Sequence, residues 1–103
     1  GIKVSVPVAN CIFRLYQEAF TNITRYAHAN EVLVAIQVPD GKIMAVVKDD
    51  GTGFNVASVQ NNKSFGILGM KERVLSLGGQ FELISEPGKG TKITVELPYD
   101  LSN

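Results

Sequence analysis

The stretch IMAVVKDDGTGF, residues 43–54, decides the fold, because in it an apolar run passes directly into acidic residues and glycines. Its first half is rich in β-branched and apolar residues, which favour a strand. A second apolar run, EVLVAIQV, occupies residues 31–38, and Pro-Asp-Gly follows at residues 39–41. An Asp-Gly turn between two such runs predicts an antiparallel hairpin, which the chain leaves through Asp49 and Asp50.

A long amphipathic helix is predicted before this hairpin. Residues 8–30 contain no Gly or Pro, and Pro7 precedes them, which suits a helix start. At about 100° per residue, two faces separate. The apolar face gathers Ile12, Tyr16, Ala19, Phe20, Ile23 and Ala27. The polar face gathers Arg14, Glu18, Thr21, Asn22 and Arg25.

A second helix and a second hairpin are predicted after it. GILGMKERVLSLGG, residues 66–79, places four apolar residues on one face and stops at two glycines. QFELISE, residues 80–86, and KITVELP, residues 92–98, alternate as strands do, with the turn PGKGT between them. The apolar face of this helix comprises Ile67, Met70, Val74 and Leu77.

The element order predicts an α+β fold, a two-layer α/β sandwich. Helices would cover one face of a mixed, mostly antiparallel sheet, because the strands come in adjacent pairs and not in alternation with helices. Residues 49–64 follow no consistent period and form a long loop for so small a domain. Long loops in compact domains are often functional, so we expect the site at this loop.

Length and composition limit the possible functions. We expect residues 1–103 to form one domain, and 45% hydrophobic residues suit a packed core. Ten basic and ten acidic residues balance, which argues against direct binding of nucleic acid to a basic surface. A single Cys and a single His exclude an internal disulfide and the usual zinc site. Because the chain begins with Gly1 and not Met, we expect it to be a piece of a longer protein.

The polar face of the first helix has two possible interpretations. Glu18, Asn22 and Arg25 follow one another at helical spacing, with Tyr26 beside them. They can form a solvated face with helix-supporting charges. They can also serve a phosphate site. An Asn amide oxygen is a neutral Mg²⁺ ligand, Glu accepts a proton, and Arg neutralises phosphate charge.

The glycine clusters also allow two interpretations. Asp49 and the glycines Gly51 and Gly53 can simply form a turn capped by an Asp side chain. Alternatively, the carboxylate can accept a hydrogen bond from an amine such as adenine N6, while glycines let the ring approach the backbone. Residues 64–70 form either a flexible junction or a helix N-terminus open to phosphates. Residues 88–91 are by themselves an ordinary hairpin turn, but together the clusters indicate a nucleotide pocket.

Four segments, in this order, carry a family resemblance. FRLYQEAFTNITRYAHA (residues 13–29) resembles the N box, and DDGTGF (49–54), SFGILGMKERV (64–74) and GKGTKITVELP (88–98) resemble three glycine boxes. The chain is thereby similar to the ATP-binding catalytic domain of sensor histidine kinases, within the GHKL ATPases and their Bergerat-type fold. QEAFTN with GILGMKERV is similar to the branch that signals to response regulators with helix-turn-helix outputs.

The resemblance implies a role for most candidate residues. Adenine would be bound by Asp49, with Thr91 supporting that pocket through water. Mg²⁺ would be bound by Asn22, and Glu18 matches the general base of the ATPase members. The other implied nucleotide contacts are Gly51 and Gly53 near the base, Arg25 and Tyr26 near phosphates or ribose, and Gly66 and Gly69 on the phosphate side. Lys71 is a further candidate phosphate contact.

The resemblance also implies partners, because the chain carries no acceptor histidine of the expected kind. His28 ends the N box, whereas the phosphorylated histidine of such kinases lies on a separate dimerisation domain. We therefore expect a monomeric, cytoplasmic ATP–Mg²⁺-binding domain that transfers phosphate poorly alone, from a parent that can be membrane-anchored and signals indirectly to a response regulator. The alternatives are an anti-sigma-factor-type serine kinase and a non-catalytic nucleotide-binding interaction module.

Overall fold

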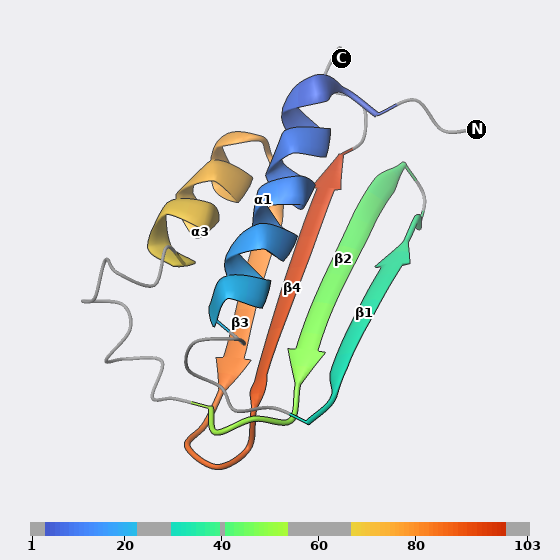
Figure 1. Cartoon of the computed structure of the whole chain (residues 1–103). Coiled ribbons are helices and arrows are strands. Elements are labelled where there is room, and N and C mark those ends of the chain that lie inside the picture. Colours follow the sequence, from blue (N-terminus) through green and yellow to red (C-terminus); the bar gives the residue numbers. More distant parts are fainter. Residues whose placement is uncertain (1–3, 23–29, 40, 54–66, 99–103) are drawn as a thin grey trace.

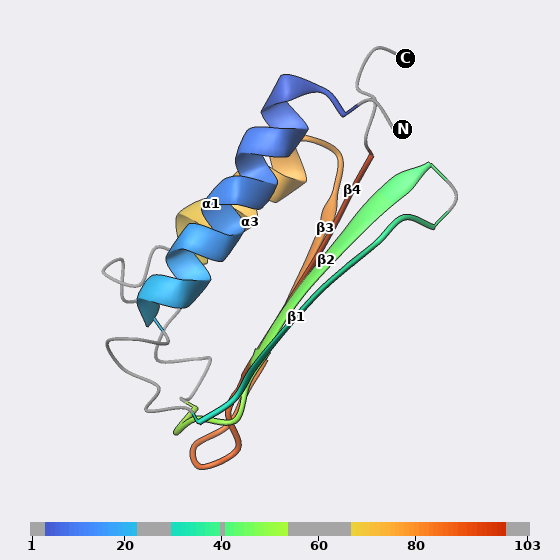
Figure 2. The ribbon, with the colours of Figure 1, turned by 45° about the vertical axis from the view of Figure 1, so that its right-hand side comes forward.

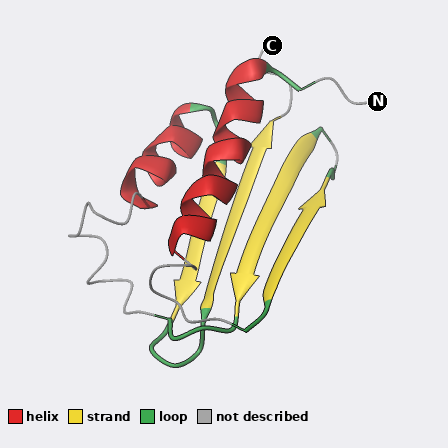
Figure 3. Cartoon of the chain, in the orientation of Figure 1, coloured by secondary structure: helices red, strands yellow, loops and turns green. Residues whose placement is uncertain are grey.

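The computed structural model describes residues 4–22, 30–39, 41–53 and 67–98, which form two helices and four strands (Figures 1 and 3). The strands agree with the predicted ranges to within one residue at each end. In chain order the elements are α1 (Val6–Asn22), β1 (Val32–Gln37), β2 (Lys42–Asp49), α3 (Ile67–Ser76), β3 (Gln80–Ser85) and β4 (Thr91–Pro98).

The strands form one sheet in the order β1-β2-β4-β3, and each neighbouring pair is antiparallel. The first hairpin closes through the predicted turn, where the Lys42 N–H donates to the Pro39 carbonyl at 2.9 Å and Gly41 has φ +79°. β2 and β4 pair along their full length at the centre of the sheet. The C-terminal end of β2 is thereby fixed beside the start of β4.

Both helices pack on the same face of the sheet, as Figure 2 shows from the side. This arrangement confirms the predicted two-layer α+β fold. Along β2, alternate residues point to the helices and are buried. The core between the layers consists of Val8, Cys11, Leu15, Ala19, Ile43, Ala45, Val47, Met70, Val74, Ile93, Val95 and Leu97.

The buried face of α1 differs from the predicted one. Phe20, which we placed in the core, is 43% exposed, and Tyr16 is only partly buried at the edge of the core. The predicted face also included Ile23 and Ala27, which lie outside the described residues. Of the predicted face, Ala19 is buried and Ile12 is partly buried; Ala19 shares its buried stripe with Val8, Cys11 and Leu15.

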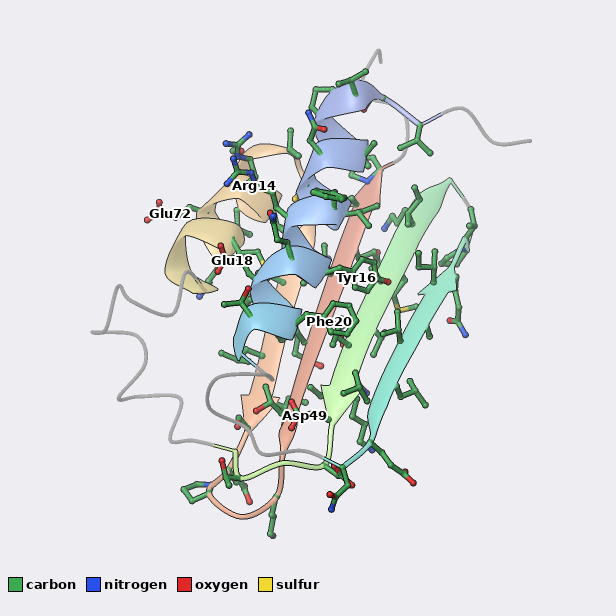
Figure 4. The ribbon with its side chains drawn as sticks, viewed as in Figure 1. Arg14, Tyr16, Glu18, Phe20, Asp49 and Glu72 are labelled. Carbon is green, nitrogen blue, oxygen red and sulfur yellow. The ribbon has the colours of Figure 1, made fainter. Side chains whose placement is uncertain are left out.

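Tyr16 and Phe20 of α1 face the β1 side of the molecule (Figure 4). The Tyr16 and Phe20 rings stack with centroids 6.4 Å apart, and the Tyr16 hydroxyl donates to the Ala35 carbonyl of β1 at 3.4 Å. β1 is an edge strand whose large apolar residues stay exposed. Smaller residues therefore occupy the closest contact between α1 and the sheet, and the rings fill the margin.

Neither described helix is long and apolar enough to cross a membrane.

Candidate functional site

Three polar residues form a row across the sheet, at the end of β2 where the DDGTGF motif begins. In the strand register Asp49 lies opposite Thr91, and Thr91 lies opposite Ser85. By alternation with the buried residues of their strands, all three point to the helix side. Asp49 is 5% exposed and Ser85 is 8% exposed. Figure 4 places Asp49 below the end of α1.

One oxygen of the Asp49 carboxylate forms the predicted turn. Its Oδ1 accepts the Gly51 N–H at 2.8 Å, which is the cap of an Asx-type turn. Among the described residues, none donates to Oδ2. A carboxylate held almost fully out of water, with one oxygen still able to accept, suits a ligand that carries an N–H donor. The turn and the binding interpretation are therefore compatible.

The glycines beside Asp49 bring two pieces of backbone together. A Cβ on Gly53 would overlap the Glu86 carbonyl, and a Cβ on Gly90 would overlap the Asp49 carbonyl. The Gly88 N–H donates to the Thr52 carbonyl across the same contact. The Cβ position of Gly53 is thus occupied by the β3–β4 turn, while the approach of a nucleotide ring to this backbone remains a prediction. At Gly51 the observed role is the N–H donated to Asp49.

Asp50 anchors the same loop to the start of β1. Its Oδ1 accepts the N–H groups of Asn30 and Glu31, both at 2.9 Å. The hydrogen bond from Glu31, together with that from Asn30, lowers the pKa of the exposed Asp50 carboxyl. This carboxylate therefore stabilises the fold above its ordinary pKa, and that contribution is lost as the pH falls through the lowered value.

A second cluster of candidate residues lies between the two helices. A hollow of about 240 Å³ there brings together Glu18 of α1 and Gly69 of α3. Figure 4 shows Glu18 and Arg14 on the side of α1 that faces α3. The hollow is lined by Cys11, Arg14, Glu18, Gly69, Met70 and Arg73. Two guanidinium groups beside one carboxylate suit an anionic ligand.

Two further observations describe this hollow. Among the described residues, and apart from the backbone of α3 itself, nothing lies within 4 Å of the position of a Gly69 Cβ at the start of α3. Burial raises the pKa of the Cys11 thiol, and the nearby Arg73 partly offsets that rise. Cys11 is therefore a core residue and not a reactive thiolate at neutral pH. Lys71, the further candidate phosphate contact, is exposed on α3.

The predicted single pocket is only partly within the described residues. Asn22 is the last residue of α1, but its side chain lies outside the description, as do the predicted contacts Arg25, Tyr26 and Gly66. Asp49 does not line the hollow that contains Glu18. Within the described ranges no group of His, Cys, Asp or Glu residues could hold a metal. The shared cavity and the Mg²⁺ site at Asn22 remain predictions.

Another hollow, of about 320 Å³, lies at the end of the sheet that carries the Asp49 row, and Asp49, Ser85 and Thr91 are among its lining residues. Its lining includes Lys48, Ile84 and Lys92, which face away from the helices by strand alternation. Residues from both faces of the sheet therefore line this hollow.

Sequence analysis missed two kinds of residue. It did not single out Ser85, although QFELISE places this serine on the same face as Phe81 and Leu83, where a polar residue is unexpected. It also gave no role to Arg14 or Arg73, whose contribution depends on how the two helices pack.

Comparison with known proteins places the chain in a family. The family of histidine kinase-, DNA gyrase B- and HSP90-like ATPases matches residues 8–101. The chain belongs to this ATPase family. Membership implies ATP binding. Similarity to sensor histidine kinases further assigns the chain to the ATP-binding domain of that class of protein.

The similar curated proteins are sensor kinases. The chain is 36% identical to an uncharacterised sensor-like histidine kinase of Chloroflexus aurantiacus, over 96% of this chain and 17% of that protein. It is 39% identical to the histidine-protein kinase/phosphatase DegS of Bacillus subtilis, over 87% of this chain and 24% of DegS. It is 38% identical to the sensor histidine kinase LiaS of the same organism, over 92% of this chain and 26% of LiaS. The chain thus spans about a quarter or less of these relatives.

Solved structures agree with this assignment. The blue-light activated histidine kinase of Erythrobacter litoralis superposes with a TM-score of 0.77 and 25% identity, over 96% of this chain and 33% of that chain. A structure of its kinase domain gives a TM-score of 0.75 at the same identity, over 91% and 46%. The resemblance inferred from the four boxes is therefore confirmed for family and fold.

The two glycines of the β3–β4 turn predict different costs of substitution in this ATPase domain. Gly90→Ala combines φ +79° with overlap on the Asp49 backbone, whereas Gly88→Ala has φ +82° but open space. We expect Gly88→Ala to cost about 1–2 kcal/mol from backbone strain alone. Gly90→Ala should cost about 1–3 kcal/mol more, because the two loops must separate. Urea unfolding of both variants measures the difference, and equal losses would contradict the proposed contact.

Proposed function

We propose that the domain binds ATP with Mg²⁺ and donates the γ-phosphoryl group to a histidine on a separate dimerisation domain of the same kinase. The supporting observation is the buried Asp49 carboxylate, with Oδ2 able to accept, in a chain whose similar relatives are sensor kinases over nearly its whole length. A response regulator with a helix-turn-helix output would then receive the phosphate. The isolated domain would be monomeric, would not bind nucleic acid, and would lie on the cytoplasmic side of any membrane-anchored parent.

The Asp49 row would bind the base. Asp49 Oδ2 would accept a hydrogen bond from the exocyclic amine of adenine, and Thr91 lies next to it in the strand register. A charged acceptor out of water makes a stronger and more selective hydrogen bond than an exposed one. Gly51 and Gly53 would contribute indirectly, by holding Asp49 in place through the turn.

The hollow between the helices would lie on the phosphate side. Gly69 leaves space at the N-terminal turn of α3, where N–H groups and the helix dipole favour anions. Arg14 and Arg73 add positive charge there, and Lys71, Gly66, Arg25 and Tyr26 would complete the contacts to phosphates and ribose. Positioning and charge neutralisation of this kind account for most of the catalysis of phosphoryl transfer.

Mg²⁺ would be bound by the Asn22 amide oxygen. One neutral ligand suits Mg²⁺, which keeps several waters and takes its other ligands from phosphates. When bound, the ion would neutralise charge on the triphosphate. Glu18, one turn before Asn22 on α1, would accept the proton released by the attacking imidazole as the new N–P bond forms and the bond to ADP breaks.

One phosphate-transfer experiment distinguishes the proposed histidine kinase from the two alternatives, a serine kinase and a non-catalytic nucleotide-binding module. The chain is incubated with γ-labelled ATP and, in separate reactions, with the dimerisation domain of a similar kinase such as DegS or with an antagonist protein of the kind that an anti-sigma-factor kinase phosphorylates. We expect label on a histidine of that domain, as an acid-labile phosphoramidate, and little label on the chain alone. Label on a serine of an antagonist protein would identify a serine kinase. ATP binding without transfer to either acceptor would identify a binding module and overturn the proposal.

The base contact is tested by Asp49→Asn. The substitution removes the charge and presents an NH₂ group to the adenine amine, so we expect ATP affinity to fall about tenfold or more. Asp50→Asn is the matched control, because it makes the same change at the next residue and retains an oxygen for the N–H groups of Asn30 and Glu31. Calorimetric ATP titration of both variants measures this, and unchanged affinity in Asp49→Asn would refute the assignment.

The phosphate side is tested by Gly69→Ala. Nothing in the described structure opposes the added methyl group, and Ala favours a helix over Gly by up to about 1 kcal/mol. We therefore expect the free energy of unfolding without nucleotide to rise, while ATP affinity falls because the methyl group occupies ligand space. Ser76→Ala, in the last turn of α3, should leave ATP affinity unchanged. A Gly69→Ala protein that binds ATP normally would exclude this role.

A further inference from the structure

We propose that Ser85 is a positioning residue that turns the Thr91 hydroxyl into a hydrogen-bond acceptor toward the base, and so favours 6-amino purines over 6-oxo purines. This inference rests on the proposed function, because it concerns the base pocket of the same site. Ser85 lies on β3, outside all four motif segments, and neither the motifs nor the turn interpretation gives it a role.

Ser85 is a buried polar residue in an apolar row. It is 8% exposed and follows Phe81 and Leu83 on the inward face of β3, both of which pack against the core. Buried hydroxyl groups are costly unless they are hydrogen-bonded, so such a position indicates a specific partner. The Ser85 Oγ lies 3.0 Å from the Gly90 carbonyl oxygen and 2.9 Å from the Thr91 Oγ1.

The direction of these two hydrogen bonds follows from counting protons. A serine hydroxyl has one proton, and a carbonyl oxygen can only accept. Since Ser85 donates to the Gly90 carbonyl, its oxygen can only accept from Thr91. The single Thr91 hydroxyl proton therefore points at Ser85, and the remaining lone pairs of Thr91 Oγ1 can only accept from other groups.

The Gly90 carbonyl is held in position by the contact between the two loops. Gly90 packs directly on the Asp49 backbone, and its φ of +79° sets the direction of its peptide. The adjacent Gly88 N–H is bonded to the Thr52 carbonyl. Because the Gly90 carbonyl is fixed in position, the Ser85 hydroxyl keeps donating to it. The Thr91 hydroxyl must then donate to Ser85, which fixes its orientation.

The pocket side of the row then presents acceptors only. Asp49 is opposite Thr91 in the register, and its Oδ2 can accept but not donate. Two neighbouring acceptors match a 6-amino group, which carries two N–H donors. They oppose a 6-oxo group, which brings a third acceptor to the same place.

The test compares ATP with inosine triphosphate, which differs at the 6-position. We expect the wild-type domain to bind ATP more tightly than inosine triphosphate. In Ser85→Ala the Thr91 hydroxyl regains rotation and can donate to the 6-oxo group, so the ratio of the two dissociation constants should fall about fivefold. A general loss of structure would weaken the binding of both nucleotides equally and leave the ratio of their dissociation constants unchanged.

Matched variants separate the Thr91 route from other effects. In a Thr91→Val background, adding Ser85→Ala should leave the ratio unchanged, because the hydroxyl through which Ser85 acts is gone. Ser85→Thr retains the hydroxyl and should keep the wild-type ratio. Ser85→Cys keeps the side-chain size but is a weaker donor, so it should lower the ratio even if the alanine variant fails to fold.

The outcomes distinguish this inference from the proposed function. Wild-type protein that binds ATP, with the same ratio in Ser85→Ala and Ser85→Cys, would overturn the role of Ser85 and leave the kinase proposal intact. A lowered ratio that persists equally in the Thr91→Val background would also overturn it. Wild-type protein that binds neither nucleotide would overturn the proposed function, and this inference with it.

Discussion

The close backbone contact between residues 49–53 and the β3–β4 turn is the constraint on which the rest of the site depends. Gly53 and Gly90 allow it, because any side chain at either position would overlap a carbonyl of the other loop. The contact fixes the end of β2 against the turn that starts β4. A buried carboxylate therefore lies beside two hydroxyl groups at one end of the sheet.

The packing of α1 sets the second half of the site. Its closest contact with the sheet uses a stripe of mostly small residues that ends at Ala19. With that stripe turned inward, Glu18 and Arg14 lie toward α3, and Tyr16 and Phe20 lie toward β1 (Figure 4). The same rotation of the helix thus decides both which side chains form the core and which charges meet Gly69.

Sequence alone predicted the strands closely and the helix face poorly, for a physical reason. Turn residues at both hairpins fix where strands begin and end, so their ranges differ little from the observed ones. The sequence of α1 is compatible with either of two adjacent stripes facing the sheet. The prediction chose the stripe with Tyr16 and Phe20, whereas the buried stripe contains Leu15 and Cys11. Phe20 stays 43% exposed, and the edge strand β1 is exposed as well, which nothing in the local sequence indicates. The hollow between α1 and α3 required the packing of both helices, so its arginines were missed.

The motif glycines were found from sequence, but their roles differ in a way that only the structure separates. At Gly53 and Gly90 the space for a side chain is already filled by protein backbone, so these glycines are part of the framework. At Gly69 no described residue fills that space, in keeping with its proposed place on the phosphate side. The same distinction applies to Asp49, whose Oδ1 forms the turn while Oδ2 stays able to accept. A tight turn would therefore keep the proposed binding group in place, because the hydrogen bond that makes the turn orients the other oxygen.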